Sequence, residues 1–285
     1  MRKNQTSLTA RGIALMRAIE SEKPADERIC YDPYARHFVP AWMYWVLGFF
    51  IKSGYAERRG PGVNGYLAAR ERYIDDVLQG YLDAGLQQLV ILGAGYDSRA
   101  YRFSLAGRVR TFEVDHPATQ ADKLENVGHI FGMIPEHVTY VGVDFNTQTL
   151  GECLSAAGYD PGLATLFIWQ GVSMYLSAEA VDATLDFVVH LSAAGSAIVF
   201  DYLYRDRLDG ATRQGEISGM RRYRFMTGEG LTFGIPKETA KEFLLVRGFK
   251  EVIDIGAEEL KAAYFTGKNA RRKVVGGYGI AVATV

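Results

Sequence analysis

The stretch that decides the fold is Gln88-Leu89-Val90-Ile91-Leu92-Gly93-Ala94-Gly95-Tyr96-Asp97-Ser98-Arg99. Its four consecutive apolar residues indicate a strand that is buried on both faces, as in a parallel sheet covered by helices. The two glycines that follow allow the backbone to approach a ligand closely, and the amides at the start of the next helix provide hydrogen-bond donors. Together they predict a nucleotide-binding turn at the carboxyl end of a buried strand.

The ligand that this turn favours is a nucleoside without a pyrophosphate. Ser98 occupies the position of the third glycine in the dinucleotide pattern Gly-x-Gly-x-x-Gly, and Asp97 brings a carboxylate toward the helix end where two phosphates should bind. The next predicted strand ends at Asp115, twenty residues beyond Gly95, where a carboxylate commonly meets ribose hydroxyls. S-adenosylmethionine fits both conditions. This cofactor suggests an enzyme that transfers a methyl group. Two alternatives compete with it: an NAD-dependent dehydrogenase, and a protein that binds the cofactor without transferring a methyl group.

The composition fits a large globular core and gives no sign of a nucleic-acid partner. The chain has 285 residues, of which 48% are apolar, and its formal net charge is −1 with acids and bases interspersed. Its two cysteines form no Cys-x-x-Cys pair, and the basic start of the chain is followed by polar residues. We therefore expect a cytoplasmic protein. The oligomeric state is left open by the sequence.

Residues 38–51 form an uncharged stretch that contains Trp42, Trp45, Phe49 and Phe50. A membrane-spanning helix needs about twenty apolar residues, so this stretch is too short to span. We expect a buried helix over the active site, which would line an apolar substrate pocket. An anchor at a membrane interface is the alternative.

From Leu86 onward, short apolar runs alternate with amphipathic segments, as in a parallel sheet with crossover helices. The expected strands are 88–93, 109–114, 138–143, 165–170, 196–201, about 250–255 and 278–284. The expected helices are 97–104, 117–128, 147–157, 178–193 and 237–247. The last strand follows two glycines without a crossover helix, so we expect it to be antiparallel. Residues 1–85 are expected to form a helical cap, and 86–285 a core with a lid insertion at about 205–235.

Five segments carry a family pattern: Asp32-Pro33-Tyr34-Ala35, Leu92 to Arg102, Phe112 to Pro117, Val143-Asp144-Phe145 and Gly171 to Leu176. In order and spacing they resemble the bacterial S-adenosylmethionine-dependent methyltransferases of the leucine carboxyl methyltransferase family. The resemblance implies an α/β fold with a seven-stranded class I methyltransferase sheet of Rossmann type and a helical N-terminal cap. It also implies methyl transfer to a carboxyl or hydroxyl oxygen.

The resemblance assigns cofactor-binding roles to five residues. Arg70 would reach the cofactor carboxylate, Gly93 would lie under the cofactor and Asp115 would accept from the ribose. Asp144 and Phe145 would meet the adenine.

One position departs from the family. Where the family usually has Glu-Gly-Val after the fourth strand, this chain has Gln170-Gly171-Val172. A neutral amide keeps a hydrogen-bond acceptor but loses the charge attraction toward a cationic cofactor, which predicts weaker cofactor binding or a changed reaction.

The reaction that we expect is O-methylation of a small or medium organic acid. A carboxylate nucleophile needs no base, so residues at the mouth of the sheet would orient and partly neutralise it. We expect Tyr175, Tyr202 and Arg222 to do this. The histidine spacing indicates no metal site.

Overall fold

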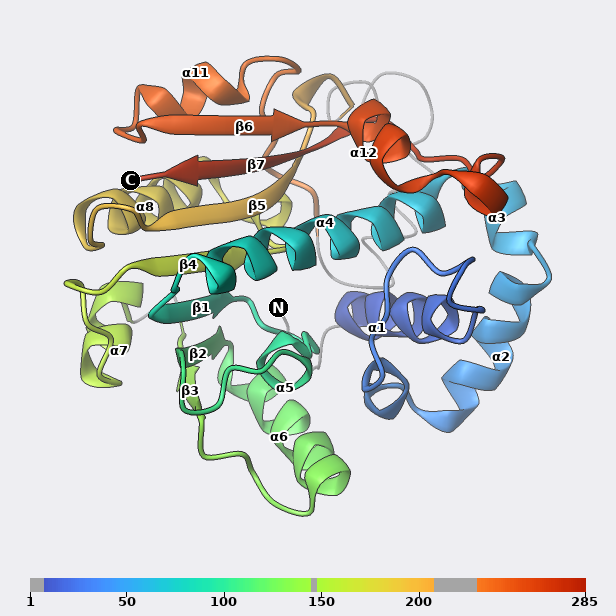
Figure 1. The fold of residues 1–285 in the computed structure, drawn as a ribbon, viewed down its shortest axis with the longest axis horizontal. Coiled ribbons are helices and arrows are strands. Elements are labelled where there is room, and N and C mark those ends of the chain that lie inside the picture. The colour runs from blue at the N-terminus through green and yellow to red at the C-terminus, as the bar shows by residue number, and fades with distance from the viewer. Residues whose placement is uncertain (1–7, 145–147, 208–229) are drawn as a thin grey trace.

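The computed structural model describes residues 8–144, 148–207 and 230–285, in which seven strands form a mixed sheet (Figure 1). The strands are β1 Gln88–Leu92, β2 Arg110–Asp115, β3 Val138–Gly142, β4 Thr165–Trp169, β5 Ala197–Leu203, β6 Glu251–Ile255 and β7 Tyr278–Thr284. Their order in the sheet is β3-β2-β1-β4-β5-β7-β6. Strand β7 is antiparallel to β5 and β6, whereas the other neighbours are parallel. All seven predicted strands and the reversed last strand are confirmed.

The α-helices are α1 Leu8–Ser21, α2 Ala41–Lys52, α3 Tyr55–Arg59, α4 Val63–Asp83, α5 Arg99–Arg102, α6 Pro117–Phe131, α7 Leu150–Ala156, α8 Ala178–His190, α11 Ala240–Leu245 and α12 Ala257–Tyr264. Three short 3-10 helices add η1 Ala35–Phe38, η2 Ser173–Tyr175 and η3 Gly267–Asn269. The five helices expected between the strands are present, most of them shorter than predicted. Helix α12 was not predicted.

The sheet separates two apolar cores because successive side chains of a strand point to opposite faces. On β5, Ile198 and Phe200 pack with residues of α7, α8 and α11, whereas Ala197 and Val199 pack with residues of α4 and α12. All residues of β1 are buried. The uninterrupted apolar run of this strand therefore reflects a sheet that is covered on both faces.

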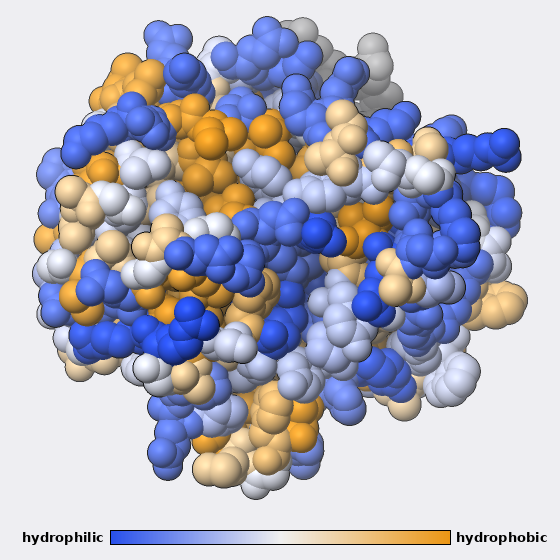
Figure 2. Space-filling view, viewed as in Figure 1, coloured by the Kyte–Doolittle hydropathy of each residue, from blue (hydrophilic) through white to orange (hydrophobic). Residues whose placement is uncertain are grey.

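Helix α4 runs along one face of the sheet, α1 lies beside the N-terminal half of α4, and α2 lies farther out (Figure 1). Polar side chains cover most of this side of the molecule, with apolar patches between them (Figure 2). Since α4 belongs to the same apolar core as β1 and β4, a division at residue 85 would separate a helix from the sheet that it covers. The division into a cap and a core stays a prediction.

Helix α2 corrects the expectation of a buried helix in residues 38–51. Met43, Tyr44 and Gly48 face the protein, but Trp42 and Trp45 are 65% and 71% exposed. The helix carries no polar residue before Lys52 that would mark an outward side. Its apolar character alone therefore could not show that only a narrow side is buried.

Two glycines of α4 provide a test of the packing. A Cβ at Gly65 would lie 2.0 Å from the Lys273 carbonyl oxygen, whereas a Cβ at Gly80 would meet nothing within 4 Å. We expect Gly65→Ala to lower the free energy of unfolding by about 1–3 kcal/mol through overpacking. Gly80→Ala should raise it by up to about 1 kcal/mol through helix propensity. Urea denaturation measures both, and equal stability of the two variants would contradict the packing of residue 273 on α4.

Candidate functional site at the carboxyl edge of the sheet

Asp115 at the end of β2 connects to the glycine turn after β1. Its carboxylate accepts hydrogen bonds from the Gly95 amide and, at 2.6 Å, from the His116 amide. Burial raises the pKa of Asp115, and the two amides act in the opposite direction. An ionised carboxylate has about four acceptor positions, so two remain for the hydroxyls of a ligand.

Gly93 brings the turn after β1 against the loop after β4. Its φ is +65°, and a Cβ there would lie 2.4 Å from Val172 Cγ2. A side chain at this position would push the two loops apart. The glycine therefore keeps these neighbouring loops close at the carboxyl edge, where parallel sheets bind ligands.

The sequence predicted a free Asp97 carboxylate at the helix end. The structure corrects this, because the carboxylate is paired. One carboxylate oxygen accepts from the Arg99 amide at 2.7 Å, and the other pairs with the Arg99 guanidinium. The carboxylate is thus neutralised by a buried partner. It still occupies an amide at the helix start that a pyrophosphate would need, so the argument against a dinucleotide rests on occupancy of the donor.

A buried ion-pair cluster lies beneath the turn, with four carboxylates against three guanidinium groups. Its members are Asp32, Glu71, Asp75, Asp97, Arg17, Arg99 and Arg102. Burial opposes the ionisation of Glu71, but the neighbouring arginines lower its pKa well below the ordinary value. The cluster therefore carries one negative charge in excess.

Glu71 brings a carboxylate to Gln170, the position where the sequence departs from the pattern that it resembles. Its Oε1 lies 2.9 Å from a nitrogen of Arg102, and its Oε2 accepts from Gln170 Nε2 at 2.8 Å. The negative charge that the resemblance implies at residue 170 thus lies one hydrogen bond away, on α4. The pairing of Glu71 with Gln170 could not be found from spacing, because the two residues are 99 residues apart.

Arg70 joins α4 to β5. Its guanidinium donates to Asp201 Oδ2 at 2.6 Å, and Asp201 Oδ1 accepts from the Gly171 amide at 2.5 Å. Burial works against the charge of Arg70, and Asp201 more than compensates, so the pKa of Arg70 is raised. Asp201 was missed by the sequence analysis, although a carboxylate in an otherwise apolar strand is a signal that could have found it.

Three buried polar atoms around Arg70 lack a hydrogen-bond partner in the described part of the chain: Arg70 Nε, Tyr66 Oη and Gln170 Oε1. Tyr66 and Arg70 lie one turn apart on α4, with the Arg70 Cζ 5.9 Å from the Tyr66 ring centre. Gln170 precedes Gly171, where a Cβ would lie 3.5 Å from Arg70 Nη1. Because buried polar atoms are rarely left unpaired, this grouping indicates a polar ligand.

Two of these atoms, Arg70 Nε and Gln170 Oε1, together with Asp115 fit S-adenosylmethionine. A guanidinium Nε–H suits the carboxylate of its amino acid tail, and an amide oxygen suits the ammonium group. The free acceptor positions of Asp115 suit the ribose hydroxyls. The site therefore offers a donor for the carboxylate of the cofactor and acceptors for its ammonium group and its ribose hydroxyls.

Apart from Tyr202, the other predicted site residues lie on the loops after β3 and β4 or outside the described residues. Asp144 is half-buried just beyond β3, and its amide donates to Gln148 at 3.1 Å. Phe145 and Arg222 lie outside the described residues. Tyr175 ends η2, next to Met174, whose carbonyl accepts from the Thr232 amide at 2.8 Å.

Tyr202 lies inside the core, and its hydroxyl donates to Asp254 at 2.8 Å. A fully buried hydroxyl that already has a partner fits a role in packing. The reaction proposed below therefore does not use Tyr202.

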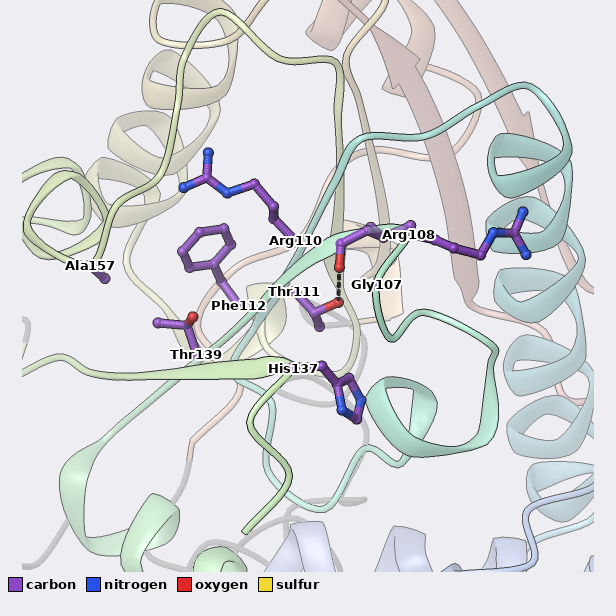
Figure 3. Close-up of a pocket in the computed structure, with 9 residues that line it drawn as sticks. Gly107, Arg108, Arg110, Thr111, Phe112, His137, Thr139 and Ala157 are labelled. Carbon is purple, nitrogen blue, oxygen red and sulfur yellow. Dashed lines mark hydrogen bonds between the residues drawn. The ribbon is translucent and has the colours of Figure 1, made fainter.

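A pocket of about 410 Å³ lies at the opposite, amino-terminal edge of β2 and β3 (Figure 3). Its lining includes Arg108, Arg110, Phe112, His137 and Thr139. Ligands of parallel sheets bind at the carboxyl ends of the strands, so this pocket does not belong to the site around Arg70.

Residues 8–144, 148–207 and 230–285 contain no group of at least three His, Cys, Asp or Glu side chains placed to hold a metal ion. In the same ranges, every helix is too short or too polar to cross a bilayer.

Exchanging residues 71 and 170 tests the pairing between them. Gln170→Glu would place a second carboxylate against Glu71, and we expect the free energy of unfolding to fall by roughly 1–4 kcal/mol. The double variant Glu71→Gln with Gln170→Glu restores an amide and a carboxylate in exchanged positions, so it should recover at least half of this loss. Urea denaturation of the wild type, the single variants Glu71→Gln and Gln170→Glu, and the double variant gives the coupling free energy. A coupling indistinguishable from zero would show that the two side chains do not interact.

Comparisons with known proteins identify the family of the chain. The family model described as leucine carboxyl methyltransferase matches residues 10–189. A protein of Streptomyces coelicolor, named as a provisional S-adenosyl-L-methionine-dependent methyltransferase, is 33% identical over 189 residues, which cover 66% of each chain. A protein of Mycobacterium marinum with the same kind of name is 33% identical over 202 residues, which cover 67% of this chain and 63% of the relative. The match thus spans about two thirds of the length of these relatives.

Two solved structures share the fold over nearly the whole chain. One is a DUF574 family protein from Streptomyces avermitilis, with a TM-score of 0.57 at 13% identity and coverage of 98% of this chain and 97% of that one. The other is a provisional methyltransferase from Thermobifida fusca, with a TM-score of 0.57 at 15% identity and coverage of 98% and 95%. The sheet is that of a class I methyltransferase. From the family match and the identity to its relatives, the chain belongs to the leucine carboxyl methyltransferase family.

Proposed function

We propose that this chain is a cytoplasmic S-adenosylmethionine-dependent O-methyltransferase that methylates a carboxylate of a small or medium organic acid. The observations that carry the proposal are the group of three unpaired polar atoms around Arg70 and the Asp115 carboxylate at the end of β2. The names of the relatives and the family membership support the cofactor. The two free cysteines support the reducing compartment.

In this proposal, the chain's residues hold the cofactor at three places. Arg70 binds the amino acid carboxylate through its Nε, while its Nη1 keeps the hydrogen bond to Asp201. Gln170 accepts from the ammonium group, and Asp115 accepts from the ribose. By resemblance, Asp144 and Phe145 meet the adenine. When bound, S-adenosylmethionine supplies a methyl group that is already activated by the sulfonium.

The acceptor would lie near Tyr175 and Arg222, which orient its carboxylate. The described ends of the insertion at about 205–235 meet at the end of β5. The Ile235 amide donates to Leu203 O at 3.0 Å. The Arg205 guanidinium donates to Gly234 O, also at 3.0 Å. The chain therefore leaves the sheet and returns to it at one place beside η2. This supports the proposal that the insertion acts as a lid over the acceptor.

The cofactor assignment is tested by calorimetry with S-adenosylmethionine, S-adenosylhomocysteine and NAD. We expect the two sulfur nucleotides to bind and NAD not to bind, because the Asp97 carboxylate occupies a helix-end amide. Asp115→Ala should weaken binding by about 1.5–3 kcal/mol for each charge-assisted hydrogen bond that is lost. Asp186→Ala, an exposed aspartate on α8, is the control and should bind like the wild type. Tight NAD binding without a response to either sulfur nucleotide would contradict the assignment.

The acceptor class is tested by a screen of carboxylic acids and phenols with methyl-labelled cofactor. For a carboxylate acceptor, the rate should be nearly constant between pH 6 and 9, because an acid with a pKa of about 4 is ionised throughout this range. A phenol with a pKa of about 10 should instead react faster as the pH rises. Methylation of phenols alone would contradict the carboxylate proposal. Cofactor binding without any S-adenosylhomocysteine produced from either class would favour a binding protein.

A further inference from the structure

Helix α2 presents an aromatic surface at the edge of the molecule, beyond α1 (Figure 1). We call it the α2 aromatic face, and it consists of Trp42, Trp45, Val46, Leu47, Phe49, Phe50 and Tyr55, each at least 38% exposed. Trp45 and Phe49, four residues apart and so on one side of the helix, are 71% and 67% exposed. Apolar side chains scattered singly over a surface are ordinary, but an aromatic group of this kind marks a contact surface.

The opposite side of α2 fixes the face in place. Met43, Tyr44 and Gly48 are buried, and Gly48 lies against α1, where a Cβ would come within 3.6 Å of Ile19 Cδ1. The Arg36 guanidinium stacks on the Tyr44 ring at 4.0 Å. The aromatic face is therefore held on a packed helix.

The charges around the face are mostly positive. Residues 33–56 contain no aspartate or glutamate, and their basic residues include Arg36 and Lys52. Helix α3, which follows, adds the exposed Arg58 and Arg59. Two acids lie nearby: Glu22 pairs with Lys52 at 2.6 Å, and Glu57 accepts from the Gly62 amide at 2.7 Å. The Glu22 charge offsets that of Lys52, which lies with Arg36 on the Tyr44 side of α2, and Glu57 keeps its charge. The basic rim of the aromatic face is therefore formed by the exposed Arg58 and Arg59.

We propose that the α2 aromatic face binds the surface of an anionic lipid bilayer. Tryptophan and phenylalanine side chains favour the boundary between headgroups and acyl chains, and neighbouring lysines and arginines favour anionic headgroups. A helix of twelve residues is about 18 Å long, which suits a helix lying in the plane of the interface. Pairing with a second copy through the same face would bring the two basic rims together, and that arrangement is repulsive. Binding to the bilayer does not require the proposed methyltransferase activity.

Tryptophan fluorescence measures this binding directly. The chain has three tryptophans, of which Trp42 and Trp45 lie on the face and Trp169 is 2% exposed in β4. With vesicles of phosphatidylcholine and phosphatidylglycerol at 7:3, we expect the emission to shift to shorter wavelength and acrylamide quenching to fall. Pure phosphatidylcholine vesicles should produce a clearly smaller change, and added salt should weaken binding to the anionic vesicles.

Variants locate the binding surface by co-sedimentation with the same vesicles. Trp45→Ser with Phe49→Ser should weaken binding on the order of tenfold or more, because two large apolar side chains are removed from the interface. Arg58→Glu with Arg59→Glu should weaken binding to anionic vesicles alone. Val246→Ser is the control, since Val246 is 73% exposed but follows α11. Thermal melting confirms that each variant is folded.

Three results would overturn the proposal. One is that the wild type fails to bind anionic vesicles at low salt, and another is that the Trp45 and Phe49 variant binds as well as the wild type. The third is a wild-type dimer in light scattering that this variant converts to a monomer without any vesicle binding. That result would assign the face to a second copy of the chain.

Discussion

The buried ion pair between Arg70 and Asp201 is the interaction on which the site depends. It joins the helix that covers one face of the sheet to a central strand, and Asp201 also holds the backbone at Gly171 after β4. Both side chains are almost fully buried, so removal of either partner would leave an uncompensated charge at a cost of about 3–5 kcal/mol. The pair holds the Arg70 Nη1 on Asp201, while its buried Nε has no partner among the described residues.

The charge cluster beneath the glycine turn has a related role. Its arginines and carboxylates connect α1, α4 and the turn after β1, which are far apart in the sequence. Buried charges are costly unless they are paired, and here nearly every charge has a partner. Glu71 pairs with three arginines of the cluster and also lies beside Gln170. The amide at residue 170, where the resemblance implies a glutamate, therefore lies next to a negative charge that α4 provides.

The α2 aromatic face shows what happens when an apolar segment is not enclosed by the fold. Only a narrow side of α2 contacts α1, and the wide side, rich in tryptophan and phenylalanine, remains outside. Water disfavours such a surface, so it calls for a partner. The basic residues at its border make an anionic bilayer the partner that best matches both its apolar and its charged parts.

The sequence by itself determined the layout of the sheet and the class of ligand. The apolar run at 88–92, the Gly-x-Gly turn and Asp115 act locally: chain periodicity, backbone freedom and a fixed spacing after the turn are enough to predict a strand, a close approach and a ribose acceptor. The antiparallel last strand followed from a connection too short for a crossover. Tertiary structure alone decided which side chains meet. Glu71 with Gln170, Arg70 with Asp201 and Asp97 with Arg99 depend on α4 packing across the sheet or on the conformation of a turn, and burial of α2 depended on how much surface α1 offered. Contacts between distant segments follow from packing in three dimensions, for which one sequence holds no local signal.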